Sequence, residues 1–251
     1  MNLQILTYHR TEPDPDPAKL HLVADREFVW QVEAISNSGI PVLDLRQSPQ
    51  RRGHCLAVTF DDGFLSDLRN AEILHSHGLT ATFFVSTALV GTPGYLDWPD
   101  IRRLHALGMA LGSHAHQHVR LTTLPVGQVR EDLATSRRML QEVLGESVDA
   151  IAFPGGDYDD TVVAVAREVG FRQLFTTHRG VNRMGDARIE GLLKRNNVIR
   201  AMTPKAFSEL LTGRPSLKRR LVHGVAASAR ALLPDKGYNA LRSLAARLRA
   251  R

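Results

Sequence analysis

The chain has 251 residues, of which 43% are hydrophobic, and its formal net charge is +6. A chain of this size and composition can bury a core without covalent cross-links, and its single cysteine, Cys55, excludes a disulfide framework and the cysteine-rich zinc modules. The sequence has no run of 18 apolar residues and no basic start followed by a long apolar stretch, so we expect a cytoplasmic protein without a membrane span.

Short apolar runs alternate with amphipathic segments along the chain, which indicates βα units. The predicted strands are Leu3–Thr7, Cys55–Phe60, Ala81–Val85, Met109–Gly112, Ala150–Phe153, Gln173–Thr176 and Asn197–Ile199. The predicted helices are Asp25–Ser38, Phe64–His77, Trp98–Ala106, Pro125–Leu144, Asp159–Val169 and Pro204–Leu211. This alternation predicts a mostly parallel sheet, open or closed into a barrel, with its chemistry in the loops that follow the strands.

The basic charge gathers at the end of the chain. Residues 214–251 carry ten Lys and Arg against Asp235 alone, so the rest of the chain is slightly acidic. We therefore expect two parts, a barrel over residues 1–213 and a basic amphipathic helical tail over residues 214–251. The tail either attracts anionic lipid head groups as a peripheral membrane anchor or caps the barrel; apart from Tyr238 it lacks interleaved aromatic residues, which argues against nucleic acid as a partner.

Two adjacent carboxylates end the second predicted strand in "TFDDG". Neighbouring side chains at a strand end point in different directions, so one of Asp61 and Asp62 can bind a metal while the other faces a substrate or a water. Gly63 then permits a tight turn. The alternative is that Asp62 caps the following helix.

Three histidines alternate after a later predicted strand, in "SHAHQH". In an extended segment His114, His116 and His118 face one way, whereas in a turn or helix His114 and His118 form an i, i+4 pair. Two imidazoles and one carboxylate with an open fourth position are the ligand set of a catalytic zinc. The alternative is a set of histidines without a ligand.

The motifs "TFDDG", "SHAHQH" and "AFPGGDYDD" resemble, in order and spacing, the first three motifs of the polysaccharide deacetylase family, also called the NodB-homology or carbohydrate esterase 4 family. The resemblance covers residues 1 to about 211. It implies an α/β fold, a distorted (β/α) barrel, and a divalent metal, usually zinc, although cobalt or a similar ion could serve. It also implies hydrolysis of N-acetyl groups on the amino sugars of a polysaccharide, oligosaccharide or lipid-linked glycan, as in exopolysaccharide biosynthesis.

The resemblance implies roles residue by residue. Asp61 resembles the catalytic base and Asp62 the metal-binding carboxylate, and His114 and His118 match the metal-binding histidines. The backbone N–H of Gly155 matches the oxyanion donor, in a loop shaped by Pro154 and Gly156. His116 matches an interior position that varies in the family, so we expect it to lie outside the ligand set.

Three positions depart from the family pattern. Ala152 stands where many members have an arginine that orients the base, Ala110 stands at an acidic position, and "GLLKRNNVI" lacks the histidine that supplies a general acid. We expect His9, which ends the first strand at the same mouth, or else His178, to act as proton donor. Arg195 could replace the missing arginine or contact substrate, because a guanidinium fork suits a carboxylate.

Trp98 precedes a helix and either stacks on a sugar face or packs against the helix start. Two other functions stay open. The His114 and His116 pair could bind zinc in an amidohydrolase, and a barrel with altered later motifs could bind glycan without turnover. Intact Asp61 and Asp62 argue against the pure binder, which has no need of a base.

Overall fold

The computed structural model describes residues 1–47, 53–185 and 189–213. The strands are β1 (Asn2–Tyr8), β2 (Thr11–Glu12), β3 (Val23–Ala24), β4 (His54–Phe60), β5 (Thr82–Val85), β6 (Ala110–Ser113), β7 (Ala150–Ala152), β8 (Gln173–Phe175), β9 (Asn182–Arg183), β10 (Gly191–Leu193) and β11 (Asn196–Asn197). The α-helices are α1 (Asp25–Asn37), α2 (Ser66–Ser76), α3 (Trp98–Ala106), α4 (Val126–Leu144), α5 (Asp160–Val169) and α6 (Pro204–Leu211). All predicted elements are present to within a residue or two, and the sequence missed the short strands β2, β3, β9 and β10.

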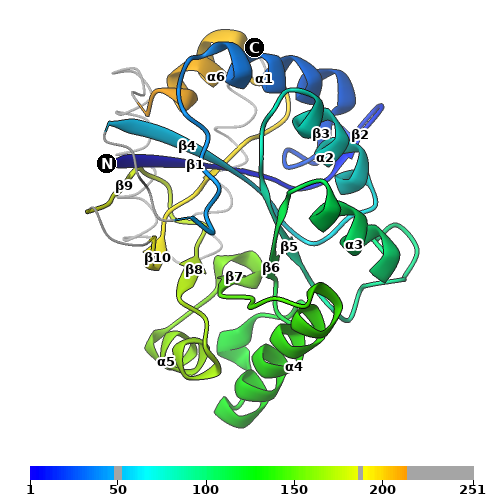
Figure 1. The fold of residues 1–251 in the computed structure, drawn as a ribbon, viewed down its shortest axis with the longest axis vertical. Coiled ribbons are helices and arrows are strands. Elements are labelled where there is room, and N and C mark those ends of the chain that lie inside the picture. Colours follow the sequence, from blue (N-terminus) through cyan, green and yellow to red (C-terminus); the bar gives the residue numbers. More distant parts are fainter. Residues whose placement is uncertain (48–52, 186–188, 214–251) are drawn as a thin grey trace. The chain divides into compact units, whose positions relative to one another are not determined.

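The main sheet runs in the order β10-β8-β7-β6-β5-β4-β1-β11, and neighbours along this path are parallel. The additional strand β9 pairs antiparallel with β1. The strands β10 and β11 lie at opposite ends of the path, yet Lys194 and Arg195 alone separate them in the chain. This short connection brings the two edges together, so the sheet is nearly closed into a barrel with helices around it (Figure 1). The expected (β/α) barrel is confirmed.

The strands divide the core into two layers by the alternation of their side chains. In β4, Cys55 and Ala57 belong to an inner cluster together with Phe84 and Phe175, whereas Leu56, Val58 and Phe60 belong to the larger cluster between sheet and helices. A period of two is what a strand buried on both faces requires. The inner layer is small, and it leaves room near the mouth for polar side chains.

Helix ends follow the local sequence. Asp97 accepts the backbone N–H of Asp100 at the start of α3, and Asp159 accepts that of Val162 at the start of α5, which satisfies donors that have no partner within the helix. Gly145 ends α4 with φ of 69°, a conformation that glycine adopts without strain. Within the described part of the chain, none of the helices combines the length and the low polarity needed to cross a bilayer. The predicted tail, 214–251, lies outside the described residues, and its boundary stays a prediction.

Candidate active site

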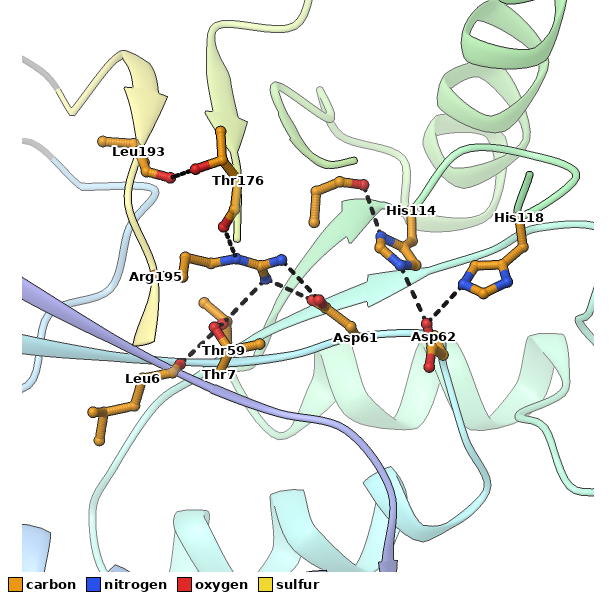
Figure 2. A network of polar contacts seen from close by, with 11 residues as sticks. Leu6, Thr7, Thr59, Asp61, Asp62, His114, His118, Thr176, Leu193 and Arg195 are labelled. Carbon is orange, nitrogen blue, oxygen red and sulfur yellow. Dashed lines mark hydrogen bonds and ion pairs between the residues drawn. The ribbon is translucent and has the colours of Figure 1, made fainter. Parts of the chain in front are cut away.

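The two carboxylates after β4 separate in space. The alternation that points Cys55 and Ala57 into the barrel continues through Thr59 to Asp61, which is 3% exposed. Asp62, the next residue, is on the opposite side of this alternation. Its backbone is left-handed with φ of 80°, a conformation that few residues other than glycine adopt readily. Each carboxylate therefore has partners of its own, as Figure 2 shows.

Asp61 is bound by Arg195, which is 1% exposed. The two terminal nitrogens of the guanidinium donate to the two carboxylate oxygens over 2.6 and 2.7 Å, which is the bidentate geometry of a strong ion pair. Burial by itself raises the pKa of Asp61, but Arg195 and His114 act against it, and the pKa lies below its usual range. Asp61 is therefore held ionised, as a base must be before it accepts a proton.

Arg195 is in turn fixed by the closure of the barrel. It follows β10, its Nε donates to the carbonyl of Thr176 over 3.0 Å, and its guanidinium lies 5.5 and 5.9 Å from the ring centres of Phe84 and Phe175. Thr59 adds a longer contact of 3.4 Å. The guanidinium fork of Arg195 is thus occupied by Asp61 and has almost no exposed surface, and a contact of Arg195 with substrate stays a prediction.

Asp62, His114 and His118 form the second group. The Nε2 atoms of His114 and His118 lie 3.2 and 3.0 Å from the same Oδ1 of Asp62. The ligand atoms of the three residues all lie within 4.8 Å of one another, as one cation would require. His114 is 2% exposed, whereas the side chain of His118 is 37% exposed, so the group opens to solvent on one side.

The contacts of these histidines fit a metal. The Nδ1 of His114 lies 2.7 Å from the carbonyl of Ala152, which needs a proton on Nδ1 and so leaves a lone pair on Nε2 for an ion. When these Nε2 atoms carry protons, they donate to Asp62 instead: burial by itself raises the pKa of Asp62, but those hydrogen bonds from His114 and His118 lower it well below its usual range. The bond to Asp62 raises the pKa of His118. This donor set suits zinc or a similar divalent ion.

His116 lies outside this group. Its Nδ1 is 2.8 Å from Oγ1 of Thr87, and its backbone carbonyl accepts the N–H of Ala88 over 3.0 Å. The His114 and His116 pair that an amidohydrolase would need is therefore not brought together around one ion. The expectation that His116 is no ligand agrees with this geometry and stays a prediction.

The loop after β7 forms a tight 3-10 turn over Pro154–Gly156. Gly155 and Gly156 have φ of 63° and 68°, and a Cβ on Gly156 would meet Thr177 Oγ1 at 2.1 Å, so the second position requires glycine. The N–H groups of Gly156 and Asp157 turn back to the carbonyls of Phe153 and Pro154. The oxyanion role of the Gly155 N–H stays a prediction.

His9 shares the electrostatic environment of the site. Burial, Arg195 and His114 lower the pKa of His9 and the carboxylates of Asp61 and Asp62 raise it; burial is the largest effect, and the pKa lies below its usual value. Its Nδ1 is buried and has no hydrogen-bond partner among the residues that the structure describes. His178 is exposed, whereas His9 is half-buried, and the His178 ring lies edge-on to Tyr158 with ring centres 5.8 Å apart.

Trp98 is the first residue of α3, half-buried and packed against the outer core. This is the packing alternative, although it leaves part of the side chain exposed. Beside it, Tyr95 stacks on Phe64 with ring centres 5.0 Å apart, so the loops after β4 and β5 meet next to Asp62. A sugar contact at Trp98 stays a prediction.

Sequence analysis missed two carboxylates that hold the histidine segment. Asp132 of α4 accepts the backbone N–H groups of His116 and Gln117, and Asp157 pairs with Arg120 and Thr122. Asp157 stands in the quoted motif "AFPGGDYDD" and could have been singled out. Asp132 gave no local signal, because an acidic residue within a polar helix looks like a solvated one.

Three comparisons place the chain among known proteins. A family model described as polysaccharide deacetylase matches residues 48–174, about half of the chain. The protein YxkH of Bacillus subtilis (strain 168) is 24% identical over 166 residues, which are 63% of this chain and 60% of YxkH, so the match spans less than two thirds of that relative.

Two solved structures share the fold. The Streptococcus pyogenes deacetylase PplD, solved in complex with acetate, has a TM-score of 0.75 at 22% identity and covers 86% of this chain and 99% of its own. IcaB from Ammonifex degensii has a TM-score of 0.73 at 26% identity, over 85% of this chain and 97% of its own.

Proposed function

Because the chain belongs to the polysaccharide deacetylase family, we propose that it is a metal-dependent hydrolase that removes N-acetyl groups from the amino sugars of a polysaccharide, an oligosaccharide or a lipid-linked glycan. One observation carries this proposal: Asp62 pairs with the two histidines, while the adjacent Asp61 pairs with Arg195. A metal-binding protein without catalysis has no need of a second, separately held carboxylate.

Asp62, His114 and His118 would hold the metal, and zinc suits two imidazoles and a carboxylate. Bound there, a divalent ion supplies a Lewis acid for the acetyl carbonyl and lowers the pKa of a water molecule. Asp61 takes the proton of the attacking water. Because Arg195 keeps Asp61 ionised, the base is available well below neutral pH.

The remaining groups act on the acetyl carbon and the leaving amine. The Gly155 N–H stabilises the charge that develops on the carbonyl oxygen, and a single donor of this kind contributes about 10²- to 10³-fold. His9 protonates the leaving amine. Its place beside Asp61 and Asp62, whose charges raise its pKa, and its buried Nδ1 with no hydrogen-bond partner among the described residues support this assignment over the exposed His178.

The saccharide would lie over the mouth formed by the loops after β4 to β8, against Pro154 and Gly156, with Trp98 at one side. Supporting this substrate class, the family is described by its action on polysaccharides. The similar structure from S. pyogenes is a complex with acetate, which is the product that N-deacetylation releases.

The proposal also includes a cytoplasmic location and a tail that keeps the enzyme near membrane-synthesised glycan. Both rest on the sequence. Co-sedimentation of the full chain with anionic and with neutral vesicles tests the tail. Pelleting with anionic vesicles supports the association, and equal recovery in both supernatants contradicts it.

Acetate release tests the reaction. The protein is stripped of metal, given Zn²⁺ or Co²⁺, and offered a panel of N-acetylated oligosaccharides, with Asp61→Asn and the exposed control Glu131→Gln alongside. Metal-dependent release that is lost in Asp61→Asn and kept in Glu131→Gln supports the proposal. Stoichiometric metal binding without release from any substrate would contradict it and favour a glycan-binding protein.

A further inference from the structure

The segment that joins the two metal-binding histidines departs from regular backbone. Ala115 and His118 have φ of 62° and 56°, in the left-handed region that residues with a Cβ rarely adopt. Such conformations persist where the surroundings impose them. The segment also passes from His114, which is buried, to His118, which is exposed. Something other than local preference must therefore hold His118 opposite His114.

Asp132 makes the contacts that impose this path. It lies on α4, is 6% exposed, and its two carboxylate oxygens accept the consecutive backbone N–H groups of His116 and Gln117 over 2.7 and 2.9 Å. Hydrogen bonds to an ionised acceptor are about twice as strong as neutral ones. The side chain thus fixes the peptides 115–116 and 116–117, which lie between the two histidines.

A second residue of α4 holds the start of the segment. Ser136 lies one turn after Asp132, and its Oγ is 2.5 Å from Oγ of Ser113, which in turn accepts the N–H of Ala115 over 3.0 Å. Residues four apart share one face of a helix. The same face of α4 therefore holds the segment on both sides of Ala115.

On the far side of His118 the chain is held more loosely. Asp157 accepts from Arg120 over 3.1 Å, from the Thr122 backbone over 3.3 Å and from the Thr122 hydroxyl, and the Arg120 side chain is 73% exposed. Exposed pairs of this kind contribute little. Asp157 acts beyond His118, whereas the buried carboxylate of Asp132 binds the residues between His114 and His118.

We propose that Asp132 is a positioning residue that sets the metal affinity of the site by holding the 115–118 segment in its left-handed path. This inference rests on the proposed function, because it takes Asp62, His114 and His118 as metal ligands. Partners that orient metal ligands without touching the metal typically change affinity by about 10- to 100-fold when they are replaced. Asp132 would do so through two backbone N–H groups and not through an imidazole.

The matched pair of variants is Asp132→Asn and Glu131→Gln. Asn has one carbonyl oxygen for two N–H groups and points its own N–H₂ at the second, whereas Glu131 is the exposed neighbour on the same helix. We expect Asp132→Asn to bind Zn²⁺ about 10- to 100-fold more weakly than the wild type. The affinity is measured by competition with a chromophoric chelator, at a temperature well below the unfolding temperature of the variant. We expect Glu131→Gln to match the wild type.

Amide hydrogen exchange supplies a readout that needs no metal. In the metal-free wild type the His116 and Gln117 amides should be protected, and in Asp132→Asn they should exchange faster while the amides of β4 do not. Should Asp132→Asn fail to fold, Ser136→Ala removes the other support from α4 and is expected to weaken Zn²⁺ binding by a few-fold.

Equal Zn²⁺ affinity of folded Asp132→Asn and wild type would overturn this role for Asp132 and leave the proposed function standing. Unprotected His116 and Gln117 amides in the wild type would overturn it as well. A wild type that binds neither Zn²⁺ nor Co²⁺ would instead remove the metal centre, and the proposed function would fail together with the inference.

Discussion

Asp61 and Asp62 are neighbours in the chain but lie in opposite surroundings. Asp61 is closed in by Arg195 at the place where the edges of the barrel meet, and both residues are almost fully buried. Asp62 faces two histidines, one of which is exposed. One side of the site is thus built like a core ion pair and the other like an open binding site.

The difference teaches which properties each side controls. A buried, paired charge cannot lose its partner without leaving an uncompensated charge, so the Asp61 side couples chemistry to stability. A substitution at the exposed His118 should cost little folding stability, because water can hydrogen-bond to the groups that it leaves. We therefore expect substitutions on the two sides to separate turnover, stability and metal binding.

The largest expected effect is on turnover in Asp61→Asn. Loss of a general base costs about 10²- to 10⁴-fold, because the amide cannot accept the proton of the water. Zn²⁺ affinity should stay within a few-fold of wild type, since Asp61 is outside the ligand group. Acetate release and Zn²⁺ titration on one preparation measure turnover and Zn²⁺ affinity. A loss of Zn²⁺ binding that matches the loss of turnover would contradict the separation of the Asp61 and Asp62 sides.

Next comes the stability of Arg195→Met, which leaves the Asp61 carboxylate buried without its partner. Breaking a buried pair in this way costs about 3 to 5 kcal/mol, to be measured as the change in unfolding free energy in urea. Arg195→Lys keeps a charge but not the fork, so its unfolding free energy should lie between those of the wild type and Arg195→Met. An unchanged urea midpoint for Arg195→Met would show that the pair does not stabilise the fold.

His118→Ala should lower Zn²⁺ affinity by more than the roughly 100-fold that supporting residues produce, because it removes a ligand atom. Its unfolding free energy without metal should change by less than about 0.5 kcal/mol, as for other exposed positions. His116→Ala is the matched control, since His116 is outside the ligand group. Equal Zn²⁺ binding by both variants would contradict the assignment of His118.

The smallest expected effect is a pH dependence at Asp157. Burial raises the pKa of this carboxyl, but the contacts with Thr122 and Arg120 together hold it below its usual range. A lowered folded pKa stabilises the protein above the unfolded value of about 3.9, and the contribution is lost as the pH falls through the folded pKa. At pH 7, Asp157→Asn should therefore be less stable by at most about 1 kcal/mol.

At pH 3 the difference between wild type and Asp157→Asn should narrow, because the wild-type carboxyl is then largely protonated when unfolded. Urea unfolding of both proteins at pH 7 and at pH 3 measures this difference in unfolding free energy. A difference that grows toward pH 3 would have the wrong sign and would exclude this explanation.

The sequence by itself determined the elements and one half of the site. Alternating apolar runs and amphipathic segments fix strands and helices locally, and parallel strands bring their carboxyl ends to one mouth. Asp61, Asp62 and the histidines follow strands directly, so their meeting could be predicted from the chain. The i, i+4 spacing likewise anticipated that His114 and His118 share a partner.

Tertiary structure alone decided the supports of the site. Arg195 reaches Asp61 across 134 residues, because the connection between β10 and β11 joins the two edges of the barrel. Asp132 reaches the histidine segment from the middle of a helix whose sequence looks solvated on that turn. Contacts of this kind depend on strand order and helix packing, which no local pattern encodes, so the sequence named Arg195 as a candidate and was silent on Asp132.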